Sequence, residues 1–244
     1  MFELSLNPWL QKLARIKTME INSDFSQRVV VHSTELPWAK SPMPGVERRM
    51  LDRIGDEVAR ATSIVRYAPE SKFSAHVHSG GEEFIVLEGV FQDEHGDYPV
   101  GSYLRNPPQS KHTPGSESGC TIFVKLWQFE PADRTPVRVN FAEIPDIISR
   151  DREGVTIKPL FKDHREEVRL EIWQPEIEVE LDLPFGAEIL VLEGALIAEQ
   201  DSLARGSWLR IPANSQLSAR AGLAGTKIWL KLGLDESFFE VRNR

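Results

Sequence analysis

Four side chains of metal-ligating types lie at short, regular spacing in the first half of the chain. His76 and His78 are two residues apart in the stretch "HVHSGGEEFIVLEG", Glu82 follows a Ser-Gly-Gly turn, and His112 comes thirty residues after Glu82. Residues two apart on a strand face the same side, with Cα atoms ~6.5–7 Å apart. The turn at residues 79–81 can bring Glu82 back beside them. Three imidazoles and one carboxylate suit a borderline divalent metal ion such as zinc, iron, manganese, nickel or copper.

An internal repeat organises the elements that must position these residues. The stretch "EFIVLEG" (83–89) matches "EILVLEG" (188–194), and "GSYLRNPPQSKH" (101–112) matches "GSWLRIPANSQL" (206–217), both at an offset of 105 residues. Two matches at one offset predict two copies of one structural unit.

The second copy has no polar residue at the four ligand positions. The residues there are Leu181, Leu183, Ala187 and Leu217. A histidine left without a partner in an apolar interior would be costly, whereas leucine fills that space. We therefore expect one metal site per chain, in the first copy.

Both copies have the pattern of β-strands. β-Branched and aromatic residues form short runs between Gly and Pro turns, which favours an antiparallel sandwich or barrel. We predict an all-β fold of two tandem small jelly-roll barrels behind a short N-terminal arm. The expected parts are the arm (1–45), a metal-binding barrel (46–132), a linker (133–153) and a second barrel without metal ligands (154–244).

Two further patterns concern packing. The stretch "EFIVLEG" has apolar residues at both odd and even positions. A strand of this kind is covered on both faces, one by its own barrel interior and the other by a neighbouring sheet, for which the other copy is a candidate. In the arm, Asn7-Pro8 is a good helix start, and Trp9, Leu10, Leu13 and Ile16 share one helical face, so a short helix docked on the barrels is expected there.

The ligand spacing resembles the two cupin motifs. The pattern His-x-His, three residues, Glu, six residues, Gly is the first motif, and Gly, five residues, Pro, four residues, His is most of the second. They occur here at His76, His78, Glu82 and Gly89, and at Gly101, Pro107 and His112. At two positions where the motifs usually have glycine, this chain has Glu70 and Gln109.

Residues 76–112 resemble, more narrowly, the cupin domain of ChrR-type anti-sigma factors, which restrain extracytoplasmic-function sigma factors. The resemblance implies a cupin barrel with a metal ion, often zinc, held by His76, His78, Glu82 and His112. In that family a separate N-terminal helical domain with its own His/Cys zinc site binds the sigma factor. This chain has only about 45 residues before the first barrel and no cysteine among them. We therefore expect no direct binding of a sigma factor. Similar cupins include small dioxygenases of diketones.

Comparison of the copies also separates pocket candidates from structural residues. Tyr103, Asn106 and Gln92 are polar only in the first copy and are candidates for lining the metal pocket. Their counterparts are Trp208, Ile211 and Ile197. Arg105 and Glu88 recur in both copies, which favours a structural role.

Composition excludes several classes of function. The net charge of −8 and the pI of about 5.4, without a local basic patch, disfavour binding to nucleic acid. A single cysteine cannot form a disulfide framework or a cysteine zinc cluster. No apolar run reaches the length of a membrane span and the N-terminus has no signal-peptide pattern, so we expect a cytoplasmic protein without membrane contact.

Two functions fit these observations. The first is a regulatory or sensing metal-binding bicupin, related to anti-sigma factors, that binds a small molecule or reacts with an oxidant. The alternative is a metal-dependent dioxygenase or related enzyme acting on a small carbonyl compound. The expected cofactor is one divalent ion, with zinc first and iron, manganese or nickel as alternatives. Four protein ligands leave two open positions on an octahedral ion and none on tetrahedral zinc. A homodimer stays an open alternative.

Overall fold

The structure is a computed structural model that describes residues 18–233 of the 244-residue chain. The helix expected around Asn7–Ile16 lies outside the described residues. Within the described part, no helix has the length and apolar character needed to cross a membrane.

The regular elements of the described chain are almost all strands. In the first half the elements are β1 (Glu20–Ile21), β2 (Val29–His32), the 3-10 helix η1 (Ser33–Glu35), β3 (Ala39–Lys40), β4 (Val46–Gly55), β5 (Ala59–Tyr67), β6 (Ser71–Lys72), β7 (His76–Val77), β8 (Glu82–Asp93), β9 (Gly96–Pro99), β10 (Ser102–Asn106), β11 (Lys111–His112), β12 (Gly115–Ser116) and β13 (Cys120–Leu126). In the second half they are β14 (Val137–Asn140), the 3-10 helix η2 (Phe141–Glu143), β15 (Ile147–Ile148), β16 (Val155–Lys162), β17 (Glu167–Trp173), β18 (Glu178–Leu183), β19 (Ala187–Ala198), β20 (Asp201–Ala204), β21 (Ser207–Ile211) and β22 (Ser215–Leu232).

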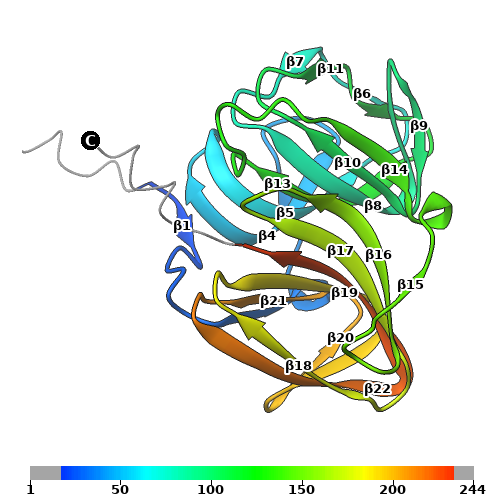
Figure 1. Ribbon diagram of the computed structural model, residues 1–244. Coiled ribbons are helices and arrows are strands. Elements are labelled where there is room, and N and C mark those ends of the chain that lie inside the picture. The colour runs from blue at the N-terminus through cyan, green and yellow to red at the C-terminus, as the bar shows by residue number, and fades with distance from the viewer. Residues whose placement is uncertain (1–17, 234–244) are drawn as a thin grey trace, which may run out of the picture.

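The two halves form two barrels, one above the other in Figure 1. The main sheet of the first runs β1-β4-β5-β13-β8-β10-β14, and that of the second runs β15-β16-β17-β22-β19-β21-β2. All pairings in both sheets are antiparallel. The predicted all-β fold of two tandem barrels is confirmed.

One strand from each half pairs with the sheet of the other barrel. β2, from the arm, pairs with β21 of the second barrel, with Val29 opposite Arg210. β14, from the predicted linker, pairs with β10 of the first barrel, with Ser102 opposite Asn140. Both of these strands are followed by a 3-10 helix, β2 by η1 and β14 by η2. The repeated structural unit therefore begins earlier in the chain than the matched sequences suggest. The arm and the linker therefore belong to the sheets, although the domain boundaries at 45, 132 and 153 stay predictions.

The strand β8 is covered on both faces, as its sequence predicts. Phe84 and Val86 pack in the interior of the first barrel. Ile85 lies between them in sequence but packs in the core between the barrels, together with Leu190 and Trp229 of the second half. Period-two alternation therefore divides one strand between two hydrophobic cores.

The glycine that ends each matched strand segment has a steric reason. Gly89 and Gly194 both have a φ of +69°, and a Cβ there would lie 2.0 Å from the carbonyl oxygen of Gly119 and 2.1 Å from that of Gly225. Only glycine tolerates this left-handed conformation and close approach together.

Buried ion pairs cross between the barrels in a reciprocal pattern. Lys231 of the second half contacts Glu83 of the first, with Nζ 2.7 Å from Oε2. Lys125 of the first half contacts Glu188 of the second at 2.5 Å. Glu166 joins the first pair, 2.7 Å from Lys231. All five side chains are buried, so the charges stabilise this interface only while each has its partner.

Candidate metal centre

A two-stranded ladder at the mouth of the first barrel aligns two of the histidines. β7 pairs with β11, and the register places His76 directly opposite His112. This ladder lies at the top of the first barrel in Figure 1. The backbone N–H of His78, just after β7, donates to the carbonyl of Ser110 at 2.9 Å. The three histidines are therefore held by one local backbone arrangement.

A tight turn returns the chain from His78 to Glu82. Gly81 has a φ of +79°, and a Cβ on Gly80 would lie 2.2 Å from the Trp127 ring. Glu82 is the first residue of β8, and its Oε2 lies 3.4 Å from Nε2 of His78 and 3.7 Å from Nε2 of His112.

The motif positions without glycine have the backbone that glycine favours. Glu70 and Gln109 have φ angles of 60° and 73°. Their approximate counterparts in the second barrel, Glu176 and Asn214, have φ angles of 62° and 58°. The turn geometry is thus kept with other residues, at the modest cost of a left-handed non-glycine conformation.

The imidazoles of His76, His78 and His112 converge on one point. One ring nitrogen from each lies within 4.8 Å of the others, a separation at which they could hold one metal ion. The three ring centroids are 4.7–5.0 Å apart. His78 and His112 are buried, whereas His76 is exposed at the mouth.

The buried atoms of this cluster fit a metal ion. Nε2 of His78 is buried and has no hydrogen-bond partner among the described residues. Buried polar atoms are normally paired because burying an unpaired one costs free energy. Burial lowers the pKa of His78, although Glu82 opposes this. The ring is therefore neutral near pH 7 and offers a lone pair, as metal binding requires.

Asp93, which the ligand spacing in the sequence does not indicate, orients His112. Its Oδ2 lies 3.3 Å from Nδ1 of His112. Burial lowers the pKa of His112, but the hydrogen bond to Asp93 and the charge of Glu82 outweigh this and raise it. A carboxylate on Nδ1 leaves Nε2 free to bind a metal. Asp93 is itself held by the backbone N–H of His95 at 2.8 Å and by the Tyr98 hydroxyl at 3.1 Å.

Comparison of the copies contains the signal for Asp93. Its counterpart at the offset of 105 is Ala198, and that of Tyr98 is Leu203. Both polar residues are therefore absent from the second copy, together with the four candidate ligands.

We predict that Asp93→Ala weakens metal binding without unfolding the protein. The second barrel accepts alanine at this position, and losing a carboxylate behind a ligating histidine typically costs about 10–100-fold in metal affinity. Competition with a chromogenic chelator measures the change. Asp97→Ala is the matched control, because Asp97 contacts Gln92 and none of the histidines. Equal affinities of the two variants would show that Asp93 does not support the site.

The three pocket candidates lie in three different places. Asn106 joins the cluster, since its Nδ2 donates to Oε2 of Glu82 at 3.1 Å. Tyr103 packs in the core between the barrels, where its hydroxyl donates to Glu83 at 2.6 Å. Gln92 contacts Asp97 and the backbone N–H of Glu117. Of the three, the structure brings only Asn106 to the ligand set.

The interior beside the ligand set is aromatic. Phe91 lies 5.8 Å from His112 between ring centroids, and Tyr67 contacts both Phe91 and Phe73 edge-on. Burial and the nearby charge of Glu82 raise the pKa of Tyr67, so its hydroxyl keeps its proton. Aromatic side chains of this kind suit contact with the apolar part of a small organic ligand.

The second barrel repeats the backbone of the site without its chemistry. Leu181 is paired with Leu217, as His76 is with His112. Leu183, Ala187 and Leu217 are buried in the interior cluster of that barrel, with Leu181 packed against it.

Comparisons with known proteins agree with this architecture. Residues 26–130 match the family model of the ChrR cupin-like domain. A search of curated proteins found no match.

Solved structures of similar fold cover most of the chain. A "putative dioxygenase" from Nostoc punctiforme has 16% identity and a TM-score of 0.71 over 87% of this chain and 84% of that chain. The protein Ylba from Escherichia coli has 15% identity and a TM-score of 0.67 over 91% and 96%. A bacterial pirin from Escherichia coli, in complex with nickel(II), has 16% identity and a TM-score of 0.62 over 85% and 99%. The chain therefore has the fold of two tandem cupin barrels, and residues 26–130, which include most of the first barrel, are similar to the ChrR cupin-like domain.

Proposed function

We propose that the first barrel holds one divalent metal ion through His76, His78, His112 and Glu82, and that this ion binds a small ligand. The observation that carries the proposal is the convergence of three ring nitrogens within 4.8 Å, together with the buried Nε2 of His78, which has no hydrogen-bond partner among the described residues. Zinc is the first choice for three imidazoles and a carboxylate, with iron, manganese or nickel as alternatives. The exposure of His76 supports access from the surface.

The role that we propose for this centre is sensing. The match to the ChrR cupin-like domain supports a regulatory protein. The neighbouring titratable group, Asp93, is already engaged by His112, the backbone of His95 and Tyr98, so it is poorly placed to move a proton to or from a substrate. The ion, when bound, would polarise an oxygen atom of the ligand, and the barrel residues would hold and desolvate its body.

The second candidate is a dioxygenase of a small carbonyl compound. The aromatic interior formed by Tyr67, Phe73 and Phe91 supports it, as does the fold shared with the Nostoc protein. Such an enzyme needs open positions on an octahedral ion such as iron, whereas four protein ligands saturate tetrahedral zinc.

Metal analysis tests the proposal and separates the two roles. We expect one metal ion per chain in protein purified without added metal, and the same content in Leu181→Ala, which changes the second barrel. Two ions per chain, or an anomalous X-ray signal beside Leu217, would contradict a single site in the first barrel.

Oxygen uptake then distinguishes the roles. A zinc-loaded protein that consumes no dioxygen with a 1,3-diketone is the expected result for a sensor. Iron-dependent oxygen uptake that is absent from His78→Leu would establish the enzyme instead.

A further inference from the structure

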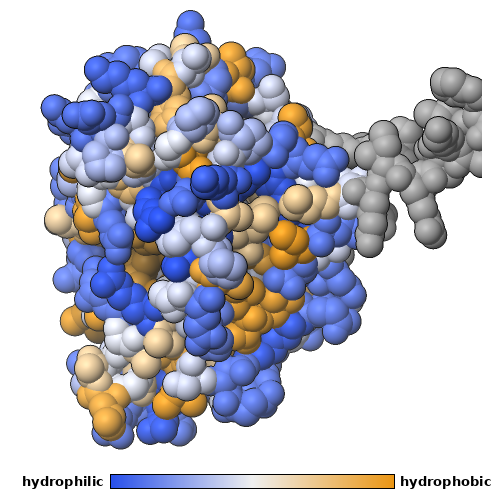
Figure 2. Space-filling model, turned by 180° about the vertical axis from the view of Figure 1, so that it is seen from behind, coloured by the Kyte–Doolittle hydropathy of each residue, from blue (hydrophilic) through white to orange (hydrophobic). Residues whose placement is uncertain are grey.

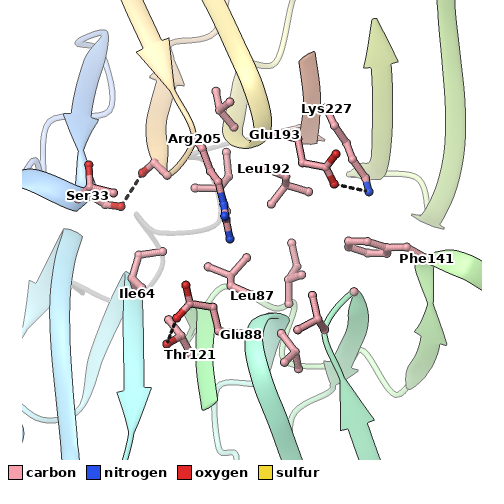
Figure 3. A pocket seen from close by; sticks show the side chains of 18 of the residues that line it. Ser33, Ile64, Leu87, Glu88, Thr121, Phe141, Leu192, Glu193, Arg205 and Lys227 are labelled. Carbon is pink, nitrogen blue, oxygen red and sulfur yellow. Dashed lines mark hydrogen bonds and ion pairs between the residues drawn. The ribbon is translucent and has the colours of Figure 1, made fainter. Parts of the chain in front are cut away.

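A cavity of about 810 Å³ lies between the two barrels, and none of the four candidate metal ligands lines it. Leu87 and Glu88 of β8 line one side, and their repeat counterparts Leu192 and Glu193 of β19 line the other (Figure 3). The cavity therefore lies where the two copies face each other. Its volume falls within the range of about 300–1,000 Å³ that is typical of small-molecule sites.

The walls of this inter-barrel cavity are largely apolar. The aliphatic and aromatic side chains that line it include Trp38, Ile64, Leu87, Phe141, Leu190 and Leu192. Figure 2 shows hydrophobic surface between hydrophilic atoms at mid-height, where the barrels meet. A ligand that fills the cavity would bury an apolar body.

The charges that line the cavity are mainly positive, although the chain has a net charge of −8. The cations are Arg49, Lys158, Arg205 and Lys227, and the anions are Glu88 and Glu193. Most of these groups have partners within the protein. Lys227 pairs with Glu193 at 3.1 Å, Lys158 pairs with Asp146 at 3.0 Å, and Arg49 lies over the ring of Trp38. Glu88 accepts a hydrogen bond from the Thr121 hydroxyl at 3.2 Å.

Arg205 is the exception among these cations. Its guanidinium points into the cavity (Figure 3), and within residues 18–233 it has no ion pair and no hydrogen bond. Its repeat counterpart is Val100, which also lines the cavity. Of the two walls, therefore, only the one from the second copy has a cation at this position. A guanidinium can bind a carboxylate through two parallel hydrogen bonds.

We propose that the inter-barrel cavity binds a small amphipathic monocarboxylate. Its carboxylate pairs with Arg205, and its apolar body lies between Leu87 and Leu192. This site is separate from the metal centre and does not depend on the metal.

Calorimetric titration of the full-length, metal-free protein tests the proposal with three probes of equal chain length. Decanoate, decanol and decyltrimethylammonium share an apolar chain and differ in the charge of the head group. We expect one decanoate per chain, with weaker binding of decanol and still weaker binding of the cation.

Two variants test whether decanoate binds in this cavity. Arg205→Val copies the residue of the first half, and we expect decanoate to bind about tenfold or more weakly while decanol is unaffected. Leu192→Trp fills the cavity and should weaken both probes. Arg220→Val is the matched control, because Arg220 is a partly buried arginine outside the cavity that pairs with Glu176.

Three outcomes would overturn the proposal. They are the absence of decanoate binding to the wild type, equal decanoate affinity of the wild type and Arg205→Val, and decanol binding as tight as that of decanoate. Because the titration uses metal-free protein, each outcome is independent of whether the metal centre performs the proposed function.

Discussion

The expected result of replacing His76→Leu, His78→Leu, Glu82→Ala and His112→Leu together is a folded protein that binds no metal. The second barrel already has these four residues, and it pairs Leu181 with Leu217 as the first pairs His76 with His112. The change removes the buried Nε2 of His78, which has no hydrogen-bond partner among the described residues. Because an unpaired buried polar group costs ~1–3 kcal/mol, the quadruple variant should be at least as stable as the metal-free wild type.

Melting temperatures of three metal-free proteins check this expectation. They are the wild type, His112→Ala and the quadruple variant, each also analysed for metal content. In His112→Ala the carboxylates of Glu82 and Asp93 both lose a histidine that they contact, so it should be the least stable of the three. Asp93→Ala can be added to the quadruple variant as a fifth substitution, which copies Ala198 of the second barrel. It removes the Asp93 carboxylate, which no longer has His112 as a partner in the quadruple variant.

The division between scaffold and site depends on this outcome. If the quadruple variant failed to fold while the metal-free wild type folded, the ligands themselves would be supporting the first barrel.

The second large effect is expected at the interface between the barrels. Lys231→Met should destabilise the protein by about 3–5 kcal/mol, because it leaves Glu83 and Glu166 buried without the cation that lies 2.7 Å from each. Urea unfolding at pH 7 measures the change. Lys162→Met is the control, since Lys162 is exposed and pairs with Glu167 at the surface, where a pair is worth about 1 kcal/mol or less. Lys231→Met with Glu83→Met should recover part of the loss, and no recovery would contradict an electrostatic cause.

The same cluster predicts how stability depends on pH. Burial alone would raise the pKa of Glu166, but the charges of Lys231 and Arg105 outweigh it and lower this pKa from 4.5 to about 2. The pKa of the folded state is thus below that of the unfolded state, so this contribution is full above pH 4.5 and is lost as the pH falls toward 2. It is on the order of 3 kcal/mol. Lys231→Met removes the largest favourable charge, so its stability should fall less steeply over this range. Parallel slopes for the two proteins would contradict this assignment.

Local patterns in the sequence were sufficient to predict the barrels. The apolar residues at both odd and even positions of "EFIVLEG" indicated burial on both faces, and Phe84 and Ile85 do lie in different cores. The contrast with apolar counterparts in the second copy indicated the candidate ligand set His76, His78, Glu82 and His112. Three of the four lie in one strand-turn-strand segment, where spacing depends on local geometry. The same contrast, applied to Asp93 and Ala198, would have found the partner of His112.

Only the tertiary structure decided which strands and side chains meet across the two halves. No local pattern shows that Val29 lies beside Arg210, because strand pairing depends on contacts distant in sequence. The contrast between Tyr103 and Trp208 also misled for this reason. Both side chains lie between the barrels, and both donate to equivalent glutamates, Tyr103 to Glu83 and Trp208 to Glu188. The sequence by itself thus determined two barrels and one candidate ligand set, whereas the docking of the barrels placed Tyr103 away from that set and formed the cavity into which Arg205 points.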